Sequence, residues 1–294
     1  VGTRLARVYT YTYVTAWGEE GPPADPSKMI YVGDDDEVTL SHFSTVPSGP
    51  YQVTAVRIYR STSGGEYLFV AEVPLPITTW EDTIPDTQLG DDLGTSLWSA
   101  PPVTLQHVVS LANGMLAGAD GNTVRICEPY QGHAWPEDYK EPLDNEITGM
   151  VAAGNYVIVT TRGNPYYGVI SAPDQRIFNK LETEQTIVSA RSLVDTGDGA
   201  IYAAADGLVL VGAGGSSLLT RDIISEEYWR SLDPETIHGY LYKGQYIGFY
   251  DSGTLGQGGF IFDFSNKSIV QISTYCTAAH SDLAEGALYM LVGG

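Results

Sequence analysis

In the first hundred residues, several short segments alternate in side-chain type from one residue to the next. This is the pattern of β-strands that bury one face. Residues 6–17 (ARVYTYTYVTAW) place valines and threonines on one face and three tyrosines on the other, which is the two-residue period of a β-strand. Similar short runs follow, namely MIYV, EVTLSHF, AVRIYRST, EYLFVAEV and TTWEDT. So many short strands within about 90 residues predict a β-sandwich of the fibronectin type III kind over residues 1–95.

Breaks in this pattern predict turns and a linker. Residues 19–23 (EEGPP) follow the first strand, and we expect a polar loop that ends strand pairing there, because proline has no backbone N–H to donate. The pair Gly64–Gly65 predicts a hairpin between two strands. Residues 86–106 carry Gly, Asp and Pro-Pro without either period, and we place a linker at residues 96–106.

From residue 107 onward the sequence repeats. Each repeat is an apolar strand, a turn with glycine, a second apolar strand and a second turn. A four-stranded propeller blade takes about 40–50 residues, so this spacing predicts an incomplete or discontinuous β-propeller over residues 107–294, with about four and a half blades. The first-turn glycines recur every 40 to 45 residues, at Gly114, Gly154, Gly199, Gly244 and Gly286, and those of the second turn are Gly121, Gly163, Gly207 and Gly253.

Two expectations follow from the incomplete count of blades. Either the ring closes with sequence beyond these residues, or another segment supplies the last strands. The chain opens at Val1 without an initiator Met, and we expect a fragment of a longer polypeptide or a processed one. One short helix is predicted between blades in residues 225–234, with Ser225 as N-cap, two glutamates in the first turn and Pro234 as a stop.

Charge and composition exclude several classes of function. With 36 acidic and 15 basic residues the net charge is −21, and such a field repels phosphate backbones, so we expect no specific nucleic-acid binding. The apolar runs are shorter than the roughly 20 residues of a membrane span. We find no signal peptide, and we expect Cys127 and Cys276 to be buried free thiols.

Motifs that could carry chemistry are better explained by turns. Asp195-Thr196-Gly197 and Asp251-Ser252-Gly253 resemble the paired aspartates of aspartic proteases, yet both fall at repeat turns. The acids of residues 34–37 lack the spacing of a calcium loop, and residues 212–217 (GAGGSS) lack the lysine of a phosphate loop, so we expect a flexible loop there. The histidines show no metal-ligand spacing: His42, His107, His133, His238 and His280. We therefore assign no catalytic residue, metal or cofactor.

One segment is a candidate interaction surface. Residues 127–139 (CEPYQGHAWPEDY) crowd aromatic residues, prolines and a histidine between two blades. Amphipathic rings of this kind could form a sugar-stacking platform, or the run could pack under its own loop with proline fixing its path, which we favour. The candidate residues are Tyr130, His133, Trp135 and Tyr139.

Several phrases together resemble a group of tailed-bacteriophage virion proteins. They are residues 7–27, 56–73 (VRIYRSTSGGEYLFVAEV), 127–139, 190–212 (ARSLVDTGDGAIYAAADGLVLVG) and 219–237 (LTRDIISEEYWRSLDPETI). The group has a fibronectin-like insertion followed by a propeller, and is akin to the tail nozzle, or tail tubular protein B, of short-tailed phages. The likeness covers nearly the whole chain.

The resemblance implies a structural subunit of the virion rather than an enzyme. It implies a homo-oligomeric ring of six copies around the channel through which DNA leaves, in contact with other tail or adaptor proteins. A net-negative lumen would let DNA pass without binding it. Two alternatives stay open, a receptor- or glycan-binding propeller module of a virion and, less favoured, a propeller hydrolase.

Overall fold

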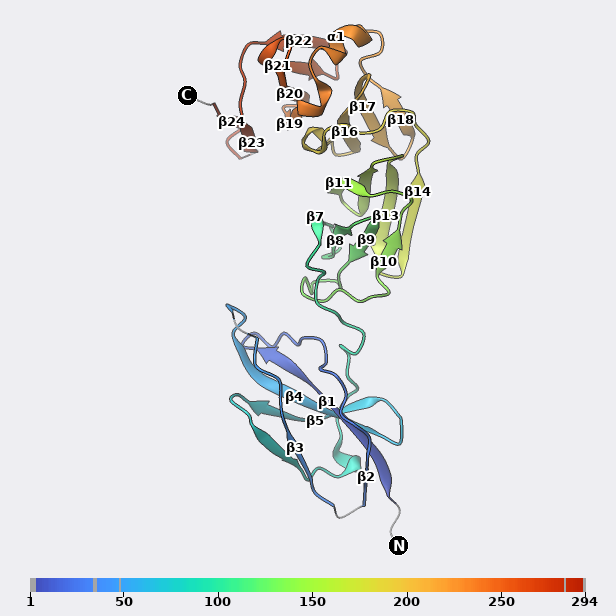
Figure 1. Cartoon of the computed structure of the whole chain (residues 1–294), viewed down its shortest axis with the longest axis vertical. Helices are drawn as coiled ribbons and strands as arrows, with labels where there is room; N and C mark the ends of the chain where they lie inside the picture. Colours follow the sequence, from blue (N-terminus) through green and yellow to red (C-terminus); the bar gives the residue numbers. More distant parts are fainter. Residues whose placement is uncertain (1–3, 34–35, 48, 283, 293–294) are drawn as a thin grey trace. The chain divides into compact units, whose positions relative to one another are not determined.

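The chain folds into strands and turns with very little helix, so the all-β class expected from the sequence is confirmed (Figure 1). The computed structural model describes residues 4–33, 36–47, 49–282 and 284–292. Two compact units are present. The first comprises Val1–Pro101 and His133–Asp138, and the second comprises Pro102–Gly132 and Tyr139–Gly294. The chain therefore leaves the first unit within the segment expected as a linker and returns to it for six residues.

The first unit contains two antiparallel sheets. The larger has four strands in the order β2-β1-β4-β5, and the smaller pairs β3 with β6. A single turn of 3-10 helix, Asp86–Gln88, follows the last strand. The strands are β1 (Leu5–Thr15), β2 (Ile30–Val32), β3 (Val38–Ser41), β4 (Val53–Thr62), β5 (Tyr67–Pro74) and β6 (Thr79–Asp82).

The tyrosine face of β1 is the face that enters the core. Tyr9 is 4% exposed and packs with Val56, Ile58 and Val70 of the same sheet. Partly buried side chains of β3 and β6, among them Trp80, join this cluster, so both sheets share one hydrophobic core. The two faces of β1 that the alternation separates are therefore an apolar inner face and a face rich in threonine.

Residues 20–27 run back along the edge of β1, and the hydroxyls of Thr10 and Thr12 on its threonine face donate to Ala24 and Glu20. The N–H groups of Gly21, Ala24 and Ser27 donate to the carbonyls of the three tyrosines of β1 at 3.0, 2.8 and 2.7 Å. Donors three residues apart match the three-residue turn of polyproline II, and the prolines of the segment fall between the donors. Residues 21–29 form no strand, and Glu20 meets Val14 only in an isolated bridge. Regular strand pairing therefore ends where we expect it, although the segment still donates every third N–H to β1.

The second unit contains four antiparallel sheets of four strands each, and every sheet follows the order of the chain. We call them sheets one to four, and the two strands that follow them the last hairpin. Sheet one has β7 (Gln106–Ser110), β8 (Leu116–Asp120), β9 (Thr123–Ile126) and β10 (Lys140–Pro142). Sheet two has β11 (Ile147–Ala153), β12 (Tyr156–Thr161), β13 (Tyr166–Ala172) and β14 (Gln175–Lys180).

The remaining strands repeat this construction. Sheet three has β15 (Val194–Asp195), β16 (Gly199–Ala204), β17 (Gly207–Gly212) and β18 (Gly215–Leu218). Sheet four has β19 (His238–Tyr242), β20 (Gln245–Ser252), β21 (Gly256–Asp263) and β22 (Ser268–Ile272). The last hairpin has β23 (Ala278–Asp282) and β24 (Ala287–Leu291). Short 3-10 turns precede sheets three and four, at Ala190–Ser192 and Pro234–Thr236.

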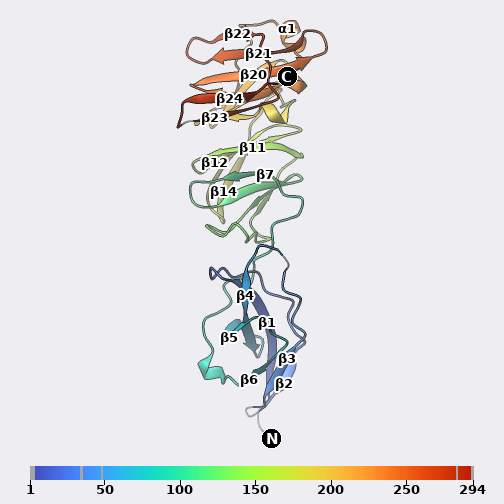
Figure 2. The same ribbon diagram turned by 90° about the vertical axis from the view of Figure 1, so that its left-hand side faces the viewer.

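Successive sheets of the second unit meet through their first strands. β7 lies against β11, β11 against β15, β15 against β19, and β19 against β23. The sheets therefore succeed one another in sequence order from β7 to β24 (Figure 1). Figure 2 turns this unit so that the last hairpin, β23 and β24, faces the viewer. Consecutive four-stranded sheets that adjoin through their first strands are compatible with a propeller-like fold.

The glycines of the first turns mostly have the backbone conformation that a tight hairpin requires. Positive φ angles of 60° to 79° occur at Gly114, Gly154, Gly244 and Gly286, a region that glycine adopts without a Cβ clash. Gly199, which we expected in the first turn of sheet three, does not turn the backbone. The turn residue is Gly197, with φ 91°, while Gly199 begins β16. A Cβ at Gly199 would lie 2.3 Å from the carbonyl oxygen of Val211.

The glycines of the second turns are less regular. Gly121 has a φ of 64°, as a tight turn requires. Gly163 and Gly253 do not have a positive φ, and Gly256 takes that role between β20 and β21, with φ 72°. Spacing alone locates a turn to within a few residues but does not say which of its residues turns the backbone.

The predicted helix is confirmed as α1 (Glu226–Arg230). Ser225 is its N-cap, and the Ser225 hydroxyl accepts a hydrogen bond from the N–H of Tyr228 at 3.2 Å. Trp229 is fully buried and donates from its ring to the carbonyl of Ala204 at 2.9 Å. Trp229 packs in a cluster with side chains of sheets three and four, so the helix fastens these two sheets together.

Two further expectations have clear outcomes. Residues 212–217 connect β17 to β18, with Gly212 opposite Gly215, so the segment is an inter-strand connection as expected, but only residues 213 and 214 lie outside the two strands. Glycine serves there to turn one strand tightly into the next.

Cys127 and Cys276 are buried free cysteines, as expected. Burial raises the pKa of both thiols, which keeps them protonated.

Candidate interaction surface

The four candidate aromatic residues are divided between the two units. His133 and Trp135 belong to the first unit, whereas Tyr130 and Tyr139 belong to the second. The structure therefore does not gather them within one compact unit, and each pair has its own surroundings.

In the first unit His133 and Trp135 anchor the returning segment. The Nε2 atom of His133 lies 3.1 Å from the carbonyl oxygen of Glu20, and its ring meets Trp98 edge to face at 5.6 Å. The N–H of Trp135 donates to the carbonyl of Ser99 at 2.9 Å, and Trp135 is 3% exposed. Both side chains are used for packing in this unit, which leaves little of Trp135 for a ligand.

Glu20 is the centre of a polar cluster that sequence reasoning missed. Its carboxylate accepts hydrogen bonds from the hydroxyls of Thr12 and Tyr59, each at 2.6 Å, and forms an ion pair with Arg57 at 2.7 Å. Arg57 also binds Glu72 at 2.8 Å. Burial, together with the bond to Glu20, raises the pKa of Tyr59. The sequence signal that could have revealed this cluster is the threonine at every second position of β1. A polar face on a buried strand requires polar partners.

In the second unit Tyr130 is the exposed member of the four. It is 81% exposed and has a φ of 60°, and its ring lies so close to Gly114 that a Cβ there would be 2.4 Å from a ring carbon. Tyr139 is half-buried, and its hydroxyl donates to Glu128 at 3.0 Å. Tyr130 is therefore the most exposed of the four candidate residues, and its ring is held at a turn.

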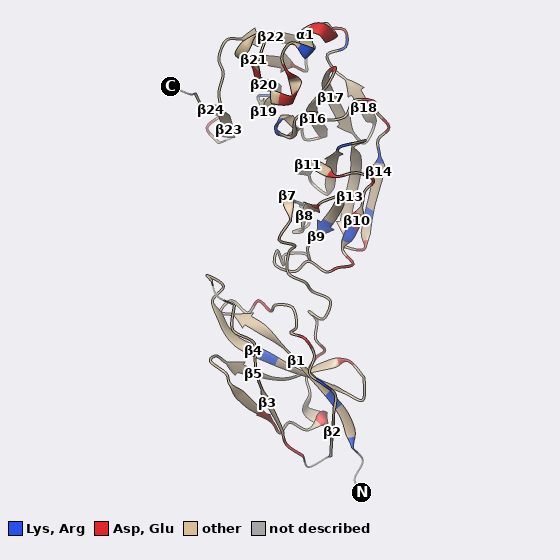
Figure 3. Cartoon of the chain, viewed as in Figure 1, with Lys and Arg blue, Asp and Glu red and all other residues tan. Residues whose placement is uncertain are grey.

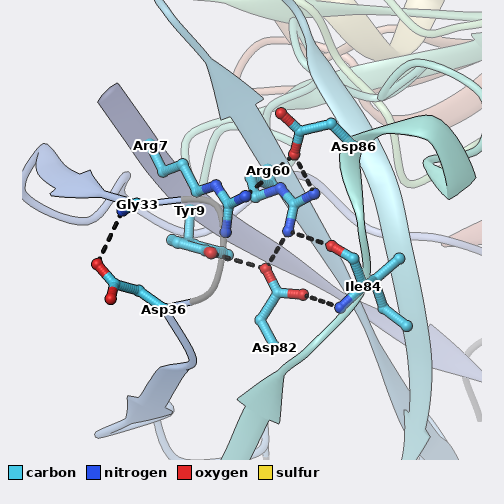
Figure 4. A network of polar contacts seen from close by, with 8 residues as sticks. All are labelled: Arg7, Tyr9, Gly33, Asp36, Arg60, Asp82, Ile84 and Asp86. Atoms are coloured by element: carbon cyan, nitrogen blue, oxygen red, sulfur yellow. Dashed lines mark hydrogen bonds and ion pairs between the residues drawn. The ribbon is translucent and has the colours of Figure 1, made fainter. Parts of the chain in front are cut away.

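A network of charged residues lies inside the first unit (Figure 4). Arg60 and Asp82 form an ion pair with no exposed side-chain surface. Arg60 also binds Asp86 at 2.6 Å, Arg7 binds the same oxygen at 3.2 Å, and Tyr9 donates to Asp82 at 2.7 Å. Burial and the bond to Asp82 raise the pKa of Tyr9 to about 12. The group joins β1 and β4 to β6, and its central ion pair is closed to solvent.

The aspartates that resembled a protease pair are each bound within their own turn. The carboxylate of Asp195 accepts from the N–H of Gly197 at 2.9 Å, and that of Asp251 accepts from Gln257 at 3.1 Å. They belong to sheets three and four respectively. A hollow of about 580 Å³ beside the β17–β18 hairpin contains a single carboxylate, that of Asp198.

Neither a metal-binding cluster nor a membrane-spanning helix occurs in the described residues. Within the described residues no three His, Cys, Asp or Glu side chains lie close enough together to hold a metal ion. Asp34 and Asp35 of the acidic run lie outside those residues, and Asp36 accepts a hydrogen bond from the N–H of Gly33 at 2.8 Å. No helix in the described ranges has the length and apolar character to cross a membrane.

Acidic and basic residues are both spread along the two units (Figure 3), and most of the basic ones are paired with acids. In the described part of the chain, at least eight of the fifteen Lys and Arg residues form ion pairs with Asp or Glu. Examples in the second unit are Lys180 with Asp144 at 3.0 Å and Arg230 with Asp206 at 2.9 Å. The acids in excess, rather than the bases, therefore dominate the field around the chain.

The last hairpin carries a row of exposed apolar side chains. Tyr289, Met290, Leu291 and Val292 are 52%, 43%, 66% and 57% exposed. Exposed apolar side chains of this kind are candidates for contact with a further segment or with another polypeptide.

Comparison with known proteins identifies no family. No family model matches the chain, and no curated protein matches it. Among solved structures, the N-terminal domain of Nup159 superposes with a TM-score of 0.39 at 11% identity, over 74% of this chain and 58% of that one. A complex of S. cerevisiae Dbp5 L327V with Nup159, Gle1 H337R, IP6 and ADP gives a TM-score of 0.28 at 12% identity, over 60% of this chain and 62% of that one. Likenesses this loose establish neither fold nor function.

Proposed function

We propose that the chain is a structural subunit of a bacteriophage tail, at the nozzle or tube end, and that it forms a ring through which DNA passes. In this proposal the first unit is a fibronectin type III-like sandwich and the second is a β-propeller with four complete blades and half of another. The chain acts in the virion through contacts with its own copies and with other tail or adaptor proteins.

The arrangement of the second unit carries the proposal. Its sheets adjoin one another in sequence order, and the row ends in a half-sheet whose outer strand exposes Tyr289 to Val292. Exposed apolar side chains such as those of Tyr289 and Leu291 are suited to contact other polypeptides. The sequence segments that resemble tail proteins suggest that these contacts are made within a phage tail.

The charge supports the passage of DNA. A net charge of −21, with much of the positive charge already paired to acids, gives a surface that repels phosphate. A channel wall of this kind lets a polyanion slide because it offers few sites at which to release counterions.

Electron microscopy tests this proposal. The protein, expressed with its natural flanking sequence, is imaged alone and within purified tails, and the expected result is a six-fold ring around an axial channel lined mainly by acidic or neutral side chains. A protein that stays monomeric and is missing from tails contradicts the structural role. A channel lined mainly by Lys and Arg contradicts the account of DNA passage.

A second function is supported by the exposure of Tyr130. A ring that is 81% exposed at a turn could stack on a sugar, as in a receptor- or glycan-binding module. A glycan array tests it. Binding that is lost in Tyr130→Ala but retained in Tyr289→Ala would favour this function over the ring.

A further inference from the structure

A hollow of about 580 Å³ opens between sheets three and four of the second unit. Sheet three contributes Ile201 and Leu210 to its lining, and sheet four contributes Phe264, which directly follows β21. All three side chains pack in the hydrophobic cluster that also contains Trp229. The hollow is therefore an opening in the core between the two sheets, and its floor is apolar.

The β17–β18 hairpin leaves this space unfilled, because residues 212–217 carry only glycine, alanine and serine. A Cβ added at Gly214 would meet no atom within 4 Å. The corresponding turns of sheets two and four contain larger side chains, such as Asp174 between β13 and β14 and Lys267 between β21 and β22. The volume of the hollow falls within the roughly 300–1,000 Å³ of pockets that hold small molecules.

The charge in the hollow comes from one carboxylate. Asp198 is exposed, and none of the described residues that line the hollow is Lys, Arg or His. The nearby Asp195 carboxylate is already used, since it accepts a hydrogen bond from the N–H of Gly197 at 2.9 Å. The Asp198 carboxylate takes part in no hydrogen bond or ion pair within the described part of the chain. It is therefore free to pair with a cation that enters from solvent.

We propose that the hollow binds a small amphipathic amine. Its apolar body packs on Ile201, Leu210 and Phe264, and its protonated nitrogen pairs with Asp198. This site goes beyond the proposed tail function and does not depend on it.

The chemistry of the hollow selects this class of ligand. Leu210 and Phe264 are half-buried, so an apolar body that covers them removes apolar surface from water. A ligand with a carboxylate or phosphate would meet Asp198 without a base to balance the repulsion. The net charge of −21 also raises the concentration of cations near the surface.

Three probes of similar shape test the preference for charge. Tryptamine carries an indole ring and a protonated amine, tryptophol has a neutral hydroxyl in place of the amine, and indole-3-propionate has a carboxylate. Each is titrated by calorimetry at neutral pH against the chain expressed with its natural flanking sequence. We expect tryptamine to bind with a Kd below about 1 mM. Tryptophol should bind about fivefold more weakly, because it lacks the ion pair, and the propionate more weakly still.

Hydrogen exchange locates the bound amine. Tryptamine is expected to add protection to the amides of residues 212–217. The hairpin between β13 and β14 (residues 172–175), which holds the corresponding position in sheet two, should show no change.

A matched pair of variants isolates the carboxylate. Asp198→Asn is expected to weaken tryptamine binding about fivefold and to leave tryptophol binding unchanged. Asp174→Asn removes an exposed carboxylate from the turn between β13 and β14 and should change neither. Ser217→Leu places an apolar side chain in the hollow and should abolish the binding of both probes. Thermal unfolding confirms that each variant folds.

Three results would overturn the inference. They are no saturable binding of tryptamine up to about 10 mM, equal effects of Asp198→Asn and Asp174→Asn, or binding to residues 1–294 that is lost when the natural flanking sequence is present. The last result would show that flanking residues occupy the hollow. None of these measurements requires a ring, so a chain that binds the amine without forming one separates this inference from the proposed tail function.

Discussion

The carbonyl oxygen of Glu20 lies 3.1 Å from Nε2 of His133, 113 positions further along the chain. This contact ties the returning segment 133–138 to the segment that covers β1 in the first unit. It is made by backbone on one side and an imidazole on the other, so it depends on where both segments are placed rather than on a local motif.

His133→Ala is expected to release the returning segment. The change removes a hydrogen bond worth about 1 kcal/mol and the contact with Trp98, so residues 127–139 should be cleaved faster by a non-specific protease. Limited proteolysis with mass spectrometry measures this. His107→Ala, at an exposed position, serves as the control, and equal cleavage of both variants would contradict the anchoring role.

Glu20→Gln is expected to lower the free energy of unfolding by about 1–3 kcal/mol. The amide keeps the shape of the side chain but loses the ion pair with Arg57, and a partly buried donor is left poorly matched. Urea unfolding followed by tyrosine fluorescence measures the change. The neighbouring Glu19→Gln should alter it by less than about 0.5 kcal/mol, and similar losses in both variants would refute the role given to Glu20.

Arg60→Met is expected to lower the free energy of unfolding by about 3–5 kcal/mol, because it leaves the carboxylate of Asp82 buried without its cation. Arg162 provides the comparison, since it pairs with Glu146 at the surface, where both side chains are more than half exposed. Arg162→Met should cost at most about 1 kcal/mol. Chemical denaturation of the two variants measures the loss of unfolding free energy. Comparable losses would mean that burial does not determine the strength of the Arg60–Asp82 pair.

His238 should make the second unit less stable in acid. The imidazole is 2% exposed, lies 3.2 Å from the Tyr240 hydroxyl and stacks on Phe249 at 5.5 Å. Burial, with a smaller effect from Arg191, lowers the pKa of His238. The folded state therefore binds a proton less readily than the unfolded state, and the stability present above about pH 6.5 is lost as the pH falls below it.

Urea titrations between pH 8 and pH 5 measure this loss. In His238→Phe the unfolding midpoint should depend less on pH over that range than in the unchanged chain. His280→Phe, which alters an exposed histidine of the last hairpin, should retain the full dependence. An identical pH dependence in all three proteins would exclude His238 as its source.

Gly199→Ala should destabilise the chain by about 1–3 kcal/mol, since the new Cβ would meet the Val211 carbonyl at 2.3 Å and backbone atoms must move. Gly214→Ala, in the same sheet, places a Cβ in open space and should be nearly neutral. Thermal unfolding compares them. If both variants melt at the same temperature, the close approach of β16 and β17 is not required.

Local patterns in the sequence determined the local structure. Alternation along residues 6–17 determined a strand, Ser225 determined the start of the helix, and Gly154 and Gly244 determined hairpin turns. In each of these the deciding interaction joins residues a few positions apart, so periodicity and turn chemistry suffice to predict it.

Only the tertiary structure decided which polar residues form buried hydrogen bonds and ion pairs, and which apolar side chains are exposed to solvent. Nothing local distinguishes Glu20 from Glu19, or Trp135 from Tyr130, because their partners come from other strands and other parts of the chain. The repeat in the sequence determined that similar sheets follow one another. That β24 is an exposed edge depends on which strands lie beside it, and strand neighbours are set by long-range packing that no single segment encodes.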